Sequence, residues 1–548
     1  MLRRLSGGAA ALALLMSAGL ASAQDFSAEA LSQGIRHISS DEFMGRYPGT
    51  EGERMTLAWL QGQYEAMGLE PGGPDGQWLQ PVSLKRYTPV EGSAVVSWTG
   101  PDGTVHPLVP GTDIMVRAAT NDGQADIAGA GLVFAGYGIH APERNWDDWG
   151  DIDVRGKVVI VMGGEPTAEA VTARFNGAYP TAYSNGWYKS DEAFRRGAVG
   201  VIVLTPVPAT HAGWLRSAQF NNRQRTLTPG AADLEFSGSI NQDTGMAWAT
   251  AAALDPALLT TVDTGTFKAV ALDGVTLSVR AAETIDTLVT HNLLARIPGT
   301  SRPDETIVYS AHWDHVGVGA DHASPVSTTE DNIYNGAWDN ASGTIGVLEM
   351  ARQMSAAPRP DRSIIFAHMA AEEMGLLGAY GYVANPVYPL EKTVADINID
   401  MLPLSGPTRD IAIFGKGQNS LEDNLAVLAA AEGRVVTDDR QPEQGFYTRS
   451  DHFPFVRAGV PALMTWHGVD WDEGGVEAGQ AAWSAKFAAD YHKPSDEWSA
   501  DWDLRSAVEN LTLLYRLGMQ LANSEEWPTW KPDSEFGARR AASDAARQ

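Results

Sequence analysis

The chain of 548 residues contains no cysteine. This absence excludes disulfide bonds, thiolate metal sites, a cysteine nucleophile and a lipidated cysteine. Any bound metal must therefore be held by histidine, aspartate and glutamate. Export of a protein without disulfides fits a bacterial periplasm or culture medium better than the outside of a eukaryotic cell.

Basic residues are scarce, since 40 Lys and Arg stand against 68 Asp and Glu and leave a formal net charge of −28. No run of Lys and Arg interrupts this acidity, and a nucleic-acid-binding face needs clustered cations. We therefore expect no nucleic-acid partner. The hydrophobic fraction of 44% is typical of a globular protein, and the length predicts two or three domains.

A long apolar stretch occurs only at the amino terminus. Arg3 and Arg4 precede small and apolar residues from 9 to 20, and Ala21-Ser22-Ala23 has the A-x-A pattern of a cleavage site. We interpret this segment, residues 1–23, as a signal peptide. A membrane anchor is the structural alternative, but the stretch is short and no stop-transfer pattern follows it. We therefore expect an exported protein without a membrane anchor.

The rest of the chain divides into regions of different character. Residues 24–124 include a helical pattern at 53–67. Residues 125–280 contain short β-type runs separated by Gly and Pro, and are interpreted as an inserted β-rich domain. Residues 281–527 alternate strands and helices, which predicts an α/β fold with a mainly parallel mixed sheet and helices on both faces. The tail, residues 528–548, is predicted to be flexible.

Ligands bind at the carboxyl ends of strands in such sheets, so polar residues that follow apolar runs are candidates for the site. His312, Asp314 and His315 directly follow a predicted strand at 306–310. A lone histidine there is more often structural. However, a ligating histidine usually donates its second ring N–H to a carboxylate, and Asp314 is placed to accept it.

Three acidic residues lie at the ends of other elements. Asp339 precedes a helix predicted at 343–354, and its structural alternative is an N-cap. Glu372 and Glu373 close an apolar strand at 363–369. Adjacent glutamates usually form a solvated surface pair, but at a strand end their repulsion is costly unless a cation neutralises it.

Two further candidates come later in the chain. Asp400 ends a predicted strand at 394–400, and His492 lies in the segment 490–496. Asp496, in the same segment, is a candidate hydrogen-bond partner of a metal ligand. His315, His368 and His452 also stand in or near these motifs.

Together these motifs resemble metallopeptidase family 28, the zinc aminopeptidase family that also has glutamate carboxypeptidase and glutaminyl cyclase relatives. The resemblance includes the early segment 39–52 and rests mainly on six motifs: HWDH at 312–315, WDNASG at 338–343, AAEEMGLLGA at 370–379, INIDM at 397–401, RSDHFPF at 449–455 and YHKPSD at 491–496. It implies a zinc exopeptidase core with the phosphorylase/hydrolase-like fold.

The resemblance also implies two zinc ions. One would be bound by His312 and Asp400, the other by Glu373 and His492, with Asp339 bridging both. Two zinc ions carry four positive charges, which balance these three carboxylates and one further glutamate.

That further glutamate is Glu372, which the resemblance implies as the general base. It would take a proton from water and pass it to the departing amine. Tyr491 matches a residue that helps to stabilise the oxyanion in some relatives, and a packed aromatic is its structural alternative. Four tryptophans are candidates for an apolar pocket or for core packing: Trp313, Trp338, Trp466 and Trp471.

The insert at 125–280 resembles a protease-associated domain, which we expect to shade the cleft or restrict substrate size; a purely structural insertion is the alternative. The whole chain is expected to be a secreted di-zinc aminopeptidase that acts on peptides with a free N-terminus. The alternatives are a glutamate-carboxypeptidase-like enzyme or a dipeptidase, a glutaminyl cyclase, and a non-catalytic receptor-like protein. A carboxypeptidase would need a basic pocket, for which Arg449 and Arg457 are the candidates.

Overall fold

The structure is a computed structural model of the 548-residue chain. It describes residues 26–547 except 168–172, 176, 178–179, 222, 228–233, 256, 259–261 and 320–330. The predicted signal peptide, residues 1–23, lies outside the described residues. Within the part of the chain that is described, no helix combines the length and the apolarity needed to cross a membrane.

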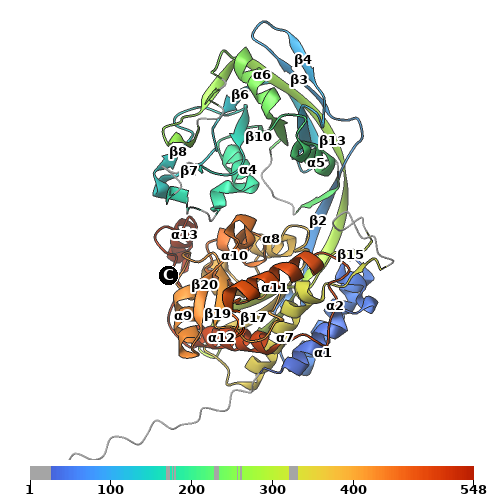
Figure 1. The fold of residues 1–548 in the computed structure, drawn as a ribbon, viewed down its shortest axis with the longest axis vertical. Coiled ribbons are helices and arrows are strands. Elements are labelled where there is room, and N and C mark those ends of the chain that lie inside the picture. Colours follow the sequence, from blue (N-terminus) through green and yellow to red (C-terminus); the bar gives the residue numbers. More distant parts are fainter. Residues whose placement is uncertain are drawn as a thin grey trace, which may run out of the picture.

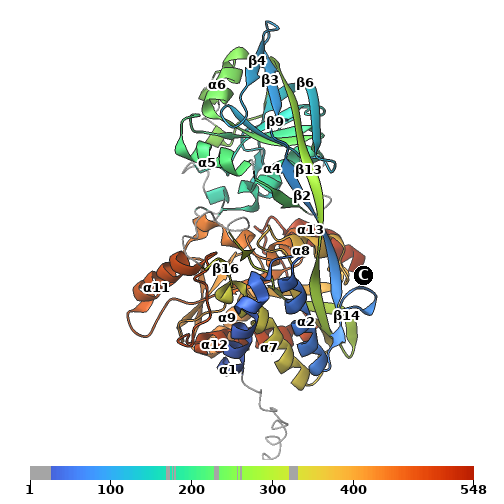
Figure 2. The same ribbon diagram turned by 90° about the vertical axis from the view of Figure 1, so that its right-hand side faces the viewer.

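Two lobes are joined by a pair of antiparallel strands (Figures 1 and 2). Strand β13 (Val270–Ile297) is 28 residues long and runs through both lobes. Strand β2 (Leu79–Pro89) pairs with its second half, from Leu79 opposite Leu293 to Pro89 opposite Glu283. The lobes therefore share continuous, hydrogen-bonded backbone rather than a flexible linker.

The sheet of the larger lobe has a parallel centre. Its four central strands, in spatial order, are β17 (Arg362–Met369), β14 (Arg302–His312), β18 (Thr393–Asn398) and β21 (Ala462–Trp466). Antiparallel neighbours flank them, with β13 beside β17 and β19 (Asp410–Phe414) beside β21. The outer strands are β1 (Glu70–Pro71) and β20 (Val435–Asp438). This arrangement confirms the predicted mainly parallel mixed sheet.

Helices cover both faces of this sheet because side chains of the central strands alternate between two apolar cores. Ile307 and Tyr309 of β14 face the larger core, and Val308 faces the other. The helices on the larger core are α1 (Ala28–Ile38), α2 (Glu51–Ala66), α7 (Ser342–Ala356), α9 (Leu421–Ala431) and α12 (Arg505–Ala522). The second core includes α8 (Leu377–Ala384) and α10 (His452–Arg457). Helices α2 and α7 confirm the two helices predicted from periodicity.

The smaller lobe is rich in β structure, as expected for the insert. Its strands are β3 (Val95–Thr99), β4 (Val105–Leu108), β5 (Ile114–Ala118), β6 (Gln124–Phe134), β7 (His140–Ala141), β8 (Trp146–Asp147), β9 (Val158–Met162), β10 (Gly200–Thr205) and β12 (Phe236–Asn241). Strand β11 (Arg225–Leu227) pairs with β2. The helices of the smaller lobe are α4 (Gly186–Arg195), α5 (Ala212–Asn221) and α6 (Gln242–Ala251).

This lobe begins earlier than residue 125, the start that the sequence predicts. Strand β3 pairs with β13, and β5 pairs with β12. The partners of these early strands lie more than a hundred residues further along the chain, so local sequence patterns do not reveal them.

The carboxyl-terminal tail is packed, which differs from the predicted flexibility. Phe536 is 5% exposed, and Trp530 donates its indole N–H to the carbonyl of Gly459 at 2.8 Å. Glu535 accepts hydrogen bonds from Arg144 and from the backbone N–H of Ala182, both at 3.0 Å and both in the smaller lobe. Helix α13 (Gly537–Arg547) follows. The aromatic side chains Trp530 and Phe536, which stand among Ala and Arg residues, thus pack the tail against the rest of the fold.

Candidate metal centre

The predicted ligands come together at the carboxyl end of the parallel strands. His312 is the last residue of β14, Glu372 and Glu373 follow β17, and Asp400 follows β18. Asp339 lies in the turn of residues 337–341 before α7. His492 follows α11 (Gly475–Asp490). Segments separated by up to 180 positions thus supply one cluster.

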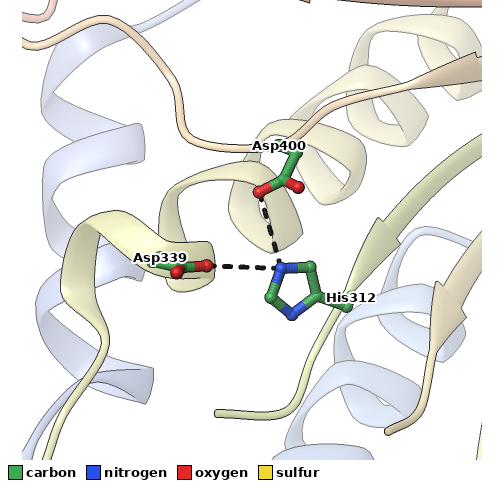
Figure 3. A group of neighbouring side chains, drawn as sticks. All are labelled: His312, Asp339 and Asp400. Atoms are coloured by element: carbon green, nitrogen blue, oxygen red, sulfur yellow. Dashed lines mark ion pairs between the residues drawn. The ribbon is translucent and has the colours of Figure 1, made fainter. Parts of the chain in front are cut away.

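A first group of donors surrounds His312. Its Nε2 atom lies 3.3 Å from Oδ1 of Asp339 and 3.5 Å from Oδ1 of Asp400 (Figure 3). The other ring nitrogen, Nδ1, lies 3.1 Å from the backbone carbonyl oxygen of Asp314. Ser450 donates to Oδ2 of Asp400 at 2.6 Å. Oδ1 of Asp400 is buried without a hydrogen-bond donor among the described residues, so it is available to a cation.

A second group lies on the other side of Asp339. Nε2 of His492 is 3.1 Å from Oδ2 of Asp339 and 3.0 Å from Oε2 of Glu373. His315 lies 2.6 Å from the remaining oxygen of Glu373, Oε1, through its Nδ1 atom. Asp339 therefore directs one carboxylate oxygen to each group.

The donor set fits zinc. Imidazole nitrogen and carboxylate oxygen are ligands that zinc accepts in proteins, and ligating carboxylates must be ionised. Burial opposes ionisation of Glu373, but His492 and His315 outweigh it and bring its pKa to about 2. Burial likewise opposes ionisation of Asp339, yet hydrogen bonds from His312 and His492 hold its pKa well below the usual range.

Glu372 stands beside the two groups. Its Oε2 atom is 3.9 Å from Nε2 of His312, beyond hydrogen-bonding distance. Burial, with further contributions from Glu373 and Asp400, outweighs the attraction of His312 and raises the pKa of Glu372 well above its usual range. A carboxyl group that is not committed to a ligand pair and has a raised pKa is suited to accept and return a proton.

Asp314 differs from its predicted role. Its Oδ1 atom is 3.8 Å from Nδ1 of His312, which is too long for a hydrogen bond. That oxygen instead accepts the backbone N–H of Glu372 at 3.1 Å. The backbone carbonyl of Asp314 orients His312, and its carboxylate orients the glutamate pair.

The carboxylate of Asp496 also accepts hydrogen bonds from backbone N–H groups. Its two carboxylate oxygens accept the N–H groups of Trp338 and Asp339, each at 2.9 Å. The carboxylate is 1% exposed, and burial raises its pKa to about 7. It fixes the turn that presents the shared candidate ligand, Asp339.

Arg46 holds the backbone next to His312 and Asp339 in place, a role that the sequence did not predict. It is fully buried and donates to four backbone carbonyls, those of Ile38, Trp313, Asn335 and Gly336, at 2.6 to 3.0 Å. The only local signal was its place in the early motif at 39–52. Arg46 thus ties the amino-terminal segment to the residues next to His312 and Asp339.

Unusual backbone conformations adjoin the site. Ala371, Met401 and His492 have φ values of 54°, 56° and 54°. Residues with a side chain rarely adopt positive φ, and such strain costs on the order of 1–3 kcal/mol per residue. Ala371 precedes Glu372, Met401 follows Asp400, and His492 is itself a candidate ligand. The surrounding fold therefore enforces the direction of the candidate ligands at the expense of local stability.

A cavity of about 730 Å³ lies between the lobes and reaches the site. Glu372, Glu373 and His492 contribute to its lining from the larger lobe, and Trp187 and Asp191 contribute from the smaller lobe. A small hollow next to it is lined by a set that includes His312, Asp339, Glu372, Asp400 and Trp466. The cluster of candidate ligands is therefore open to a molecule bound between the lobes.

Tyr491 lines both spaces and accepts a hydrogen bond from Arg449 at 3.2 Å. Of the four candidate tryptophans, Trp466 lines the small hollow, whereas Trp313 is buried in the larger core. Of the three extra histidines, His315 contacts the site, whereas His368 is hydrogen-bonded to Tyr64 in the core at 2.6 Å. His452 is buried against Tyr447.

Comparison with known proteins relates part of the chain to one peptidase family. The model of peptidase family M28 matches residues 292–515. Leupeptin-inactivating enzyme 1 of Streptomyces exfoliatus is 30% identical over 210 residues, which cover 38% of this chain and 43% of that protein. Aminopeptidase YwaD of Bacillus subtilis (strain 168) is 31% identical over 166 residues, which cover 30% of this chain and 32% of that protein. The chain thus matches less than half the length of these curated relatives.

A solved aminopeptidase from Aneurinibacillus sp. strain AM-1 aligns over 92% of this chain and 96% of its own, at 20% identity and a TM-score of 0.47. The region that carries His312, Asp339, Glu372, Glu373, Asp400 and His492 lies inside the family match. The chain therefore carries a domain of peptidase family M28 over residues 292–515.

Proposed function

We propose that the protein is an exported, zinc-dependent aminopeptidase. The observation that carries this proposal is the pair of donor groups that share Asp339, with Glu372 uncommitted beside them. The similarity to an aminopeptidase and to a leupeptin-inactivating enzyme supports a peptidase activity.

Two zinc ions would be held by five side chains. His312 and Asp400 would hold one, Glu373 and His492 the other, and Asp339 both. Zinc in such a site supplies Lewis acidity towards a carbonyl oxygen and lowers the pKa of water towards about 7. His315 would orient Glu373 through the oxygen that faces away from His492.

Glu372 would carry the proton. Its carboxylate accepts a proton from the attacking water and returns it to the nitrogen of the leaving amine. The backbone N–H that it donates to Asp314 holds it at the edge of both cavities. The hydroxyl of Tyr491, at the same edge, would donate a hydrogen bond to the oxyanion that develops on the substrate.

The free amine of a peptide would lie at the carboxylates of the site. Asp339 and Glu373 supply negative charge there, which an ammonium or amine group complements. The smaller lobe, which resembles a protease-associated domain, would limit the length of peptide that fits between the lobes. Export is supported by the signal-peptide pattern of residues 1–23.

The proposal is tested with the purified protein on a panel of matched peptides with free and acetylated N-termini. We expect release of the N-terminal residue from free peptides only, loss of activity on thorough chelation, and recovery when zinc is restored. Hydrolysis of the acetylated peptides, or activity that survives chelation, would contradict it. Formation of a cyclised N-terminus in place of a free amino acid would favour a glutaminyl cyclase.

A further inference from the structure

The guanidinium of Arg449 has no carboxylate partner in the described part of the chain. Its polar contacts are the hydroxyl of Tyr491 at 3.2 Å and the carbonyl of Gln444 at 3.5 Å. It also stacks over the ring of Phe446, with 5.1 Å to the centroid. Arginine carries its charge at all physiological pH values, so the exposed guanidinium has neutral contacts but no ion pair among the described residues.

Arg449 stands at the border between the metal-ligand cluster and the open cavity. It lines the cavity of about 730 Å³ together with Glu372 and Tyr491, and it also lines the small hollow that contains His312 and Asp400. A substrate whose amine lies at the carboxylates of the site must therefore pass close to this guanidinium.

The other two arginines of the cavity do not line the small hollow beside the metal-ligand candidates. Arg457 pairs with Asp191 at 2.7 Å, donates to the hydroxyl of Tyr380 at 3.0 Å, and stacks on Trp187 at 3.8 Å. Arg539 donates to the carbonyl of Arg457 at 2.7 Å and has no ion pair among the described residues, but it lies outside the small hollow. Asp191 belongs to the smaller lobe, so the charge of Arg457 serves the contact between lobes. Arg449 has no such counter-ion.

We infer that Arg449 binds a carboxylate of the substrate on the residue that follows the scissile bond. The planar guanidinium presents paired N–H donors that match the two oxygens of a carboxylate. One residue of extended chain spans about 3.5 Å, so a carboxylate on the second residue lies within reach when the first residue occupies the site. The carboxylate is the free terminus of a dipeptide or the side chain of an acidic second residue.

This inference rests on the proposed function for its orientation of the peptide, and it narrows the substrate class. Dipeptides and peptides with aspartate or glutamate at the second position are preferred over longer neutral peptides. Recognition of the carboxylate by Arg449 changes the binding affinity of the peptide, so it can be measured without turnover.

The test uses the zinc-loaded Glu372→Gln protein and calorimetric binding of leucylglycine and leucylglycinamide. We expect the free acid to bind about tenfold more tightly than the amide, as for a hydrogen bond to a charged group. Adding Arg449→Met should bring this ratio to about one by weakening the free acid alone, because the amide does not use the charge. Arg155→Met, at an exposed ion pair away from both cavities, is the matched control and should leave the ratio unchanged.

A second pair of peptides identifies the source of the carboxylate. The α-amide of leucylaspartic acid (Leu-Asp-NH₂), which keeps a free side-chain carboxylate, is compared with leucylasparagine amide. A preference in this pair assigns the acidic side chain, and a preference confined to leucylglycine assigns the peptide terminus.

Equal affinities for acid and amide in both pairs would overturn the inference. So would an Arg449→Met variant that weakens acid and amide alike, because that pattern indicates a residue that only positions Tyr491. Failure of the proposed function looks different: the wild-type protein hydrolyses no peptide, while the acid-to-amide binding ratio persists.

Discussion

Asp339 and Asp496 are 157 residues apart in the chain, and the carboxylate of Asp496 accepts the backbone N–H of Asp339 at 2.9 Å. The other oxygen of Asp496 accepts the N–H of Trp338 at the same distance. Both oxygens of one buried carboxylate therefore hold the backbone that presents the shared candidate ligand.

Replacement of Asp496 by asparagine should weaken metal binding. The substitution places an NH₂ group opposite a backbone N–H, so one of the two hydrogen bonds becomes a repulsive contact. Loss of an outer hydrogen bond of this type lowers metal affinity about 10- to 100-fold, which competition with a chromophoric chelator measures. Asp503→Asn, at an ion pair with Arg505, is the control and should retain wild-type affinity. Unchanged affinity in Asp496→Asn would show that the turn holds without it.

The candidate ligands could be predicted from sequence because each stands at the end of an element. His312 and Asp400 close apolar strands whose carboxyl ends meet at one edge of the sheet. The supporting bonds could not be predicted in the same way. Arg46 reaches Gly336 across 290 positions, and no periodicity in either segment encodes that contact. The predicted insert leaves out the early strands β3 and β5 for the same reason, since their pairing with distant strands is a property of topology.

Glu372→Gln should abolish turnover while zinc binding is retained. Glutamine keeps the size of the side chain but accepts no proton, and removal of a general base typically lowers the rate about 10²- to 10⁴-fold. Steady-state rates on a free dipeptide and zinc content by elemental analysis give the two readouts. The exposed Glu473→Gln serves as the control. Loss of zinc from Glu372→Gln would mean that the roles of Glu372 and Glu373 are exchanged.

Arg46→Met should destabilise the protein strongly. The side chain is 0% exposed and bonds to four buried carbonyls, and an unsatisfied buried acceptor costs about 1–3 kcal/mol. We therefore expect the free energy of unfolding to fall by at least about 3 kcal/mol even after partial relaxation. Thermal and denaturant unfolding measure the change. Arg54→Met, whose arginine side chain is 67% exposed, should stay within about 0.5 kcal/mol of wild type.

Phe536→Ala tests whether the tail is a structural part of the fold. Phe536 packs in a cluster with Phe453, Val456 and Leu376 of the larger lobe and Ala182 of the smaller lobe. Truncation of a buried phenylalanine costs about 3–5 kcal/mol. We expect a lower Tm and faster proteolysis at the junction of the lobes. An unchanged Tm would restore the prediction of a flexible tail.

Lys189 of the smaller lobe should make stability depend on pH in the alkaline range. The side chain is 1% exposed and donates to the carbonyl of Tyr137 at 2.6 Å. Burial lowers the pKa of Lys189 from 10.5 to about 7, although Asp148 and Glu165 act in the opposite direction. Between these two values the unfolded chain binds the proton and the folded protein does not, so the stability that this group contributes rises with pH.

The contribution of Lys189 is therefore fully present above pH 10.5 and is lost as pH falls towards about 7. Its upper bound is about 5 kcal/mol, from about 1.4 kcal/mol for each pKa unit. Lys189→Met removes the titration, so the Tm difference between variant and wild type should move in favour of the variant as pH is lowered from about 10 to about 7. Because the variant and the wild type share all other groups that titrate in the alkaline range, the effect of those groups cancels in the Tm difference. The control is Lys416→Met, at an exposed ion pair, which should show no such trend. A Tm difference that is constant with pH would mean that Lys189 keeps its proton in the folded protein.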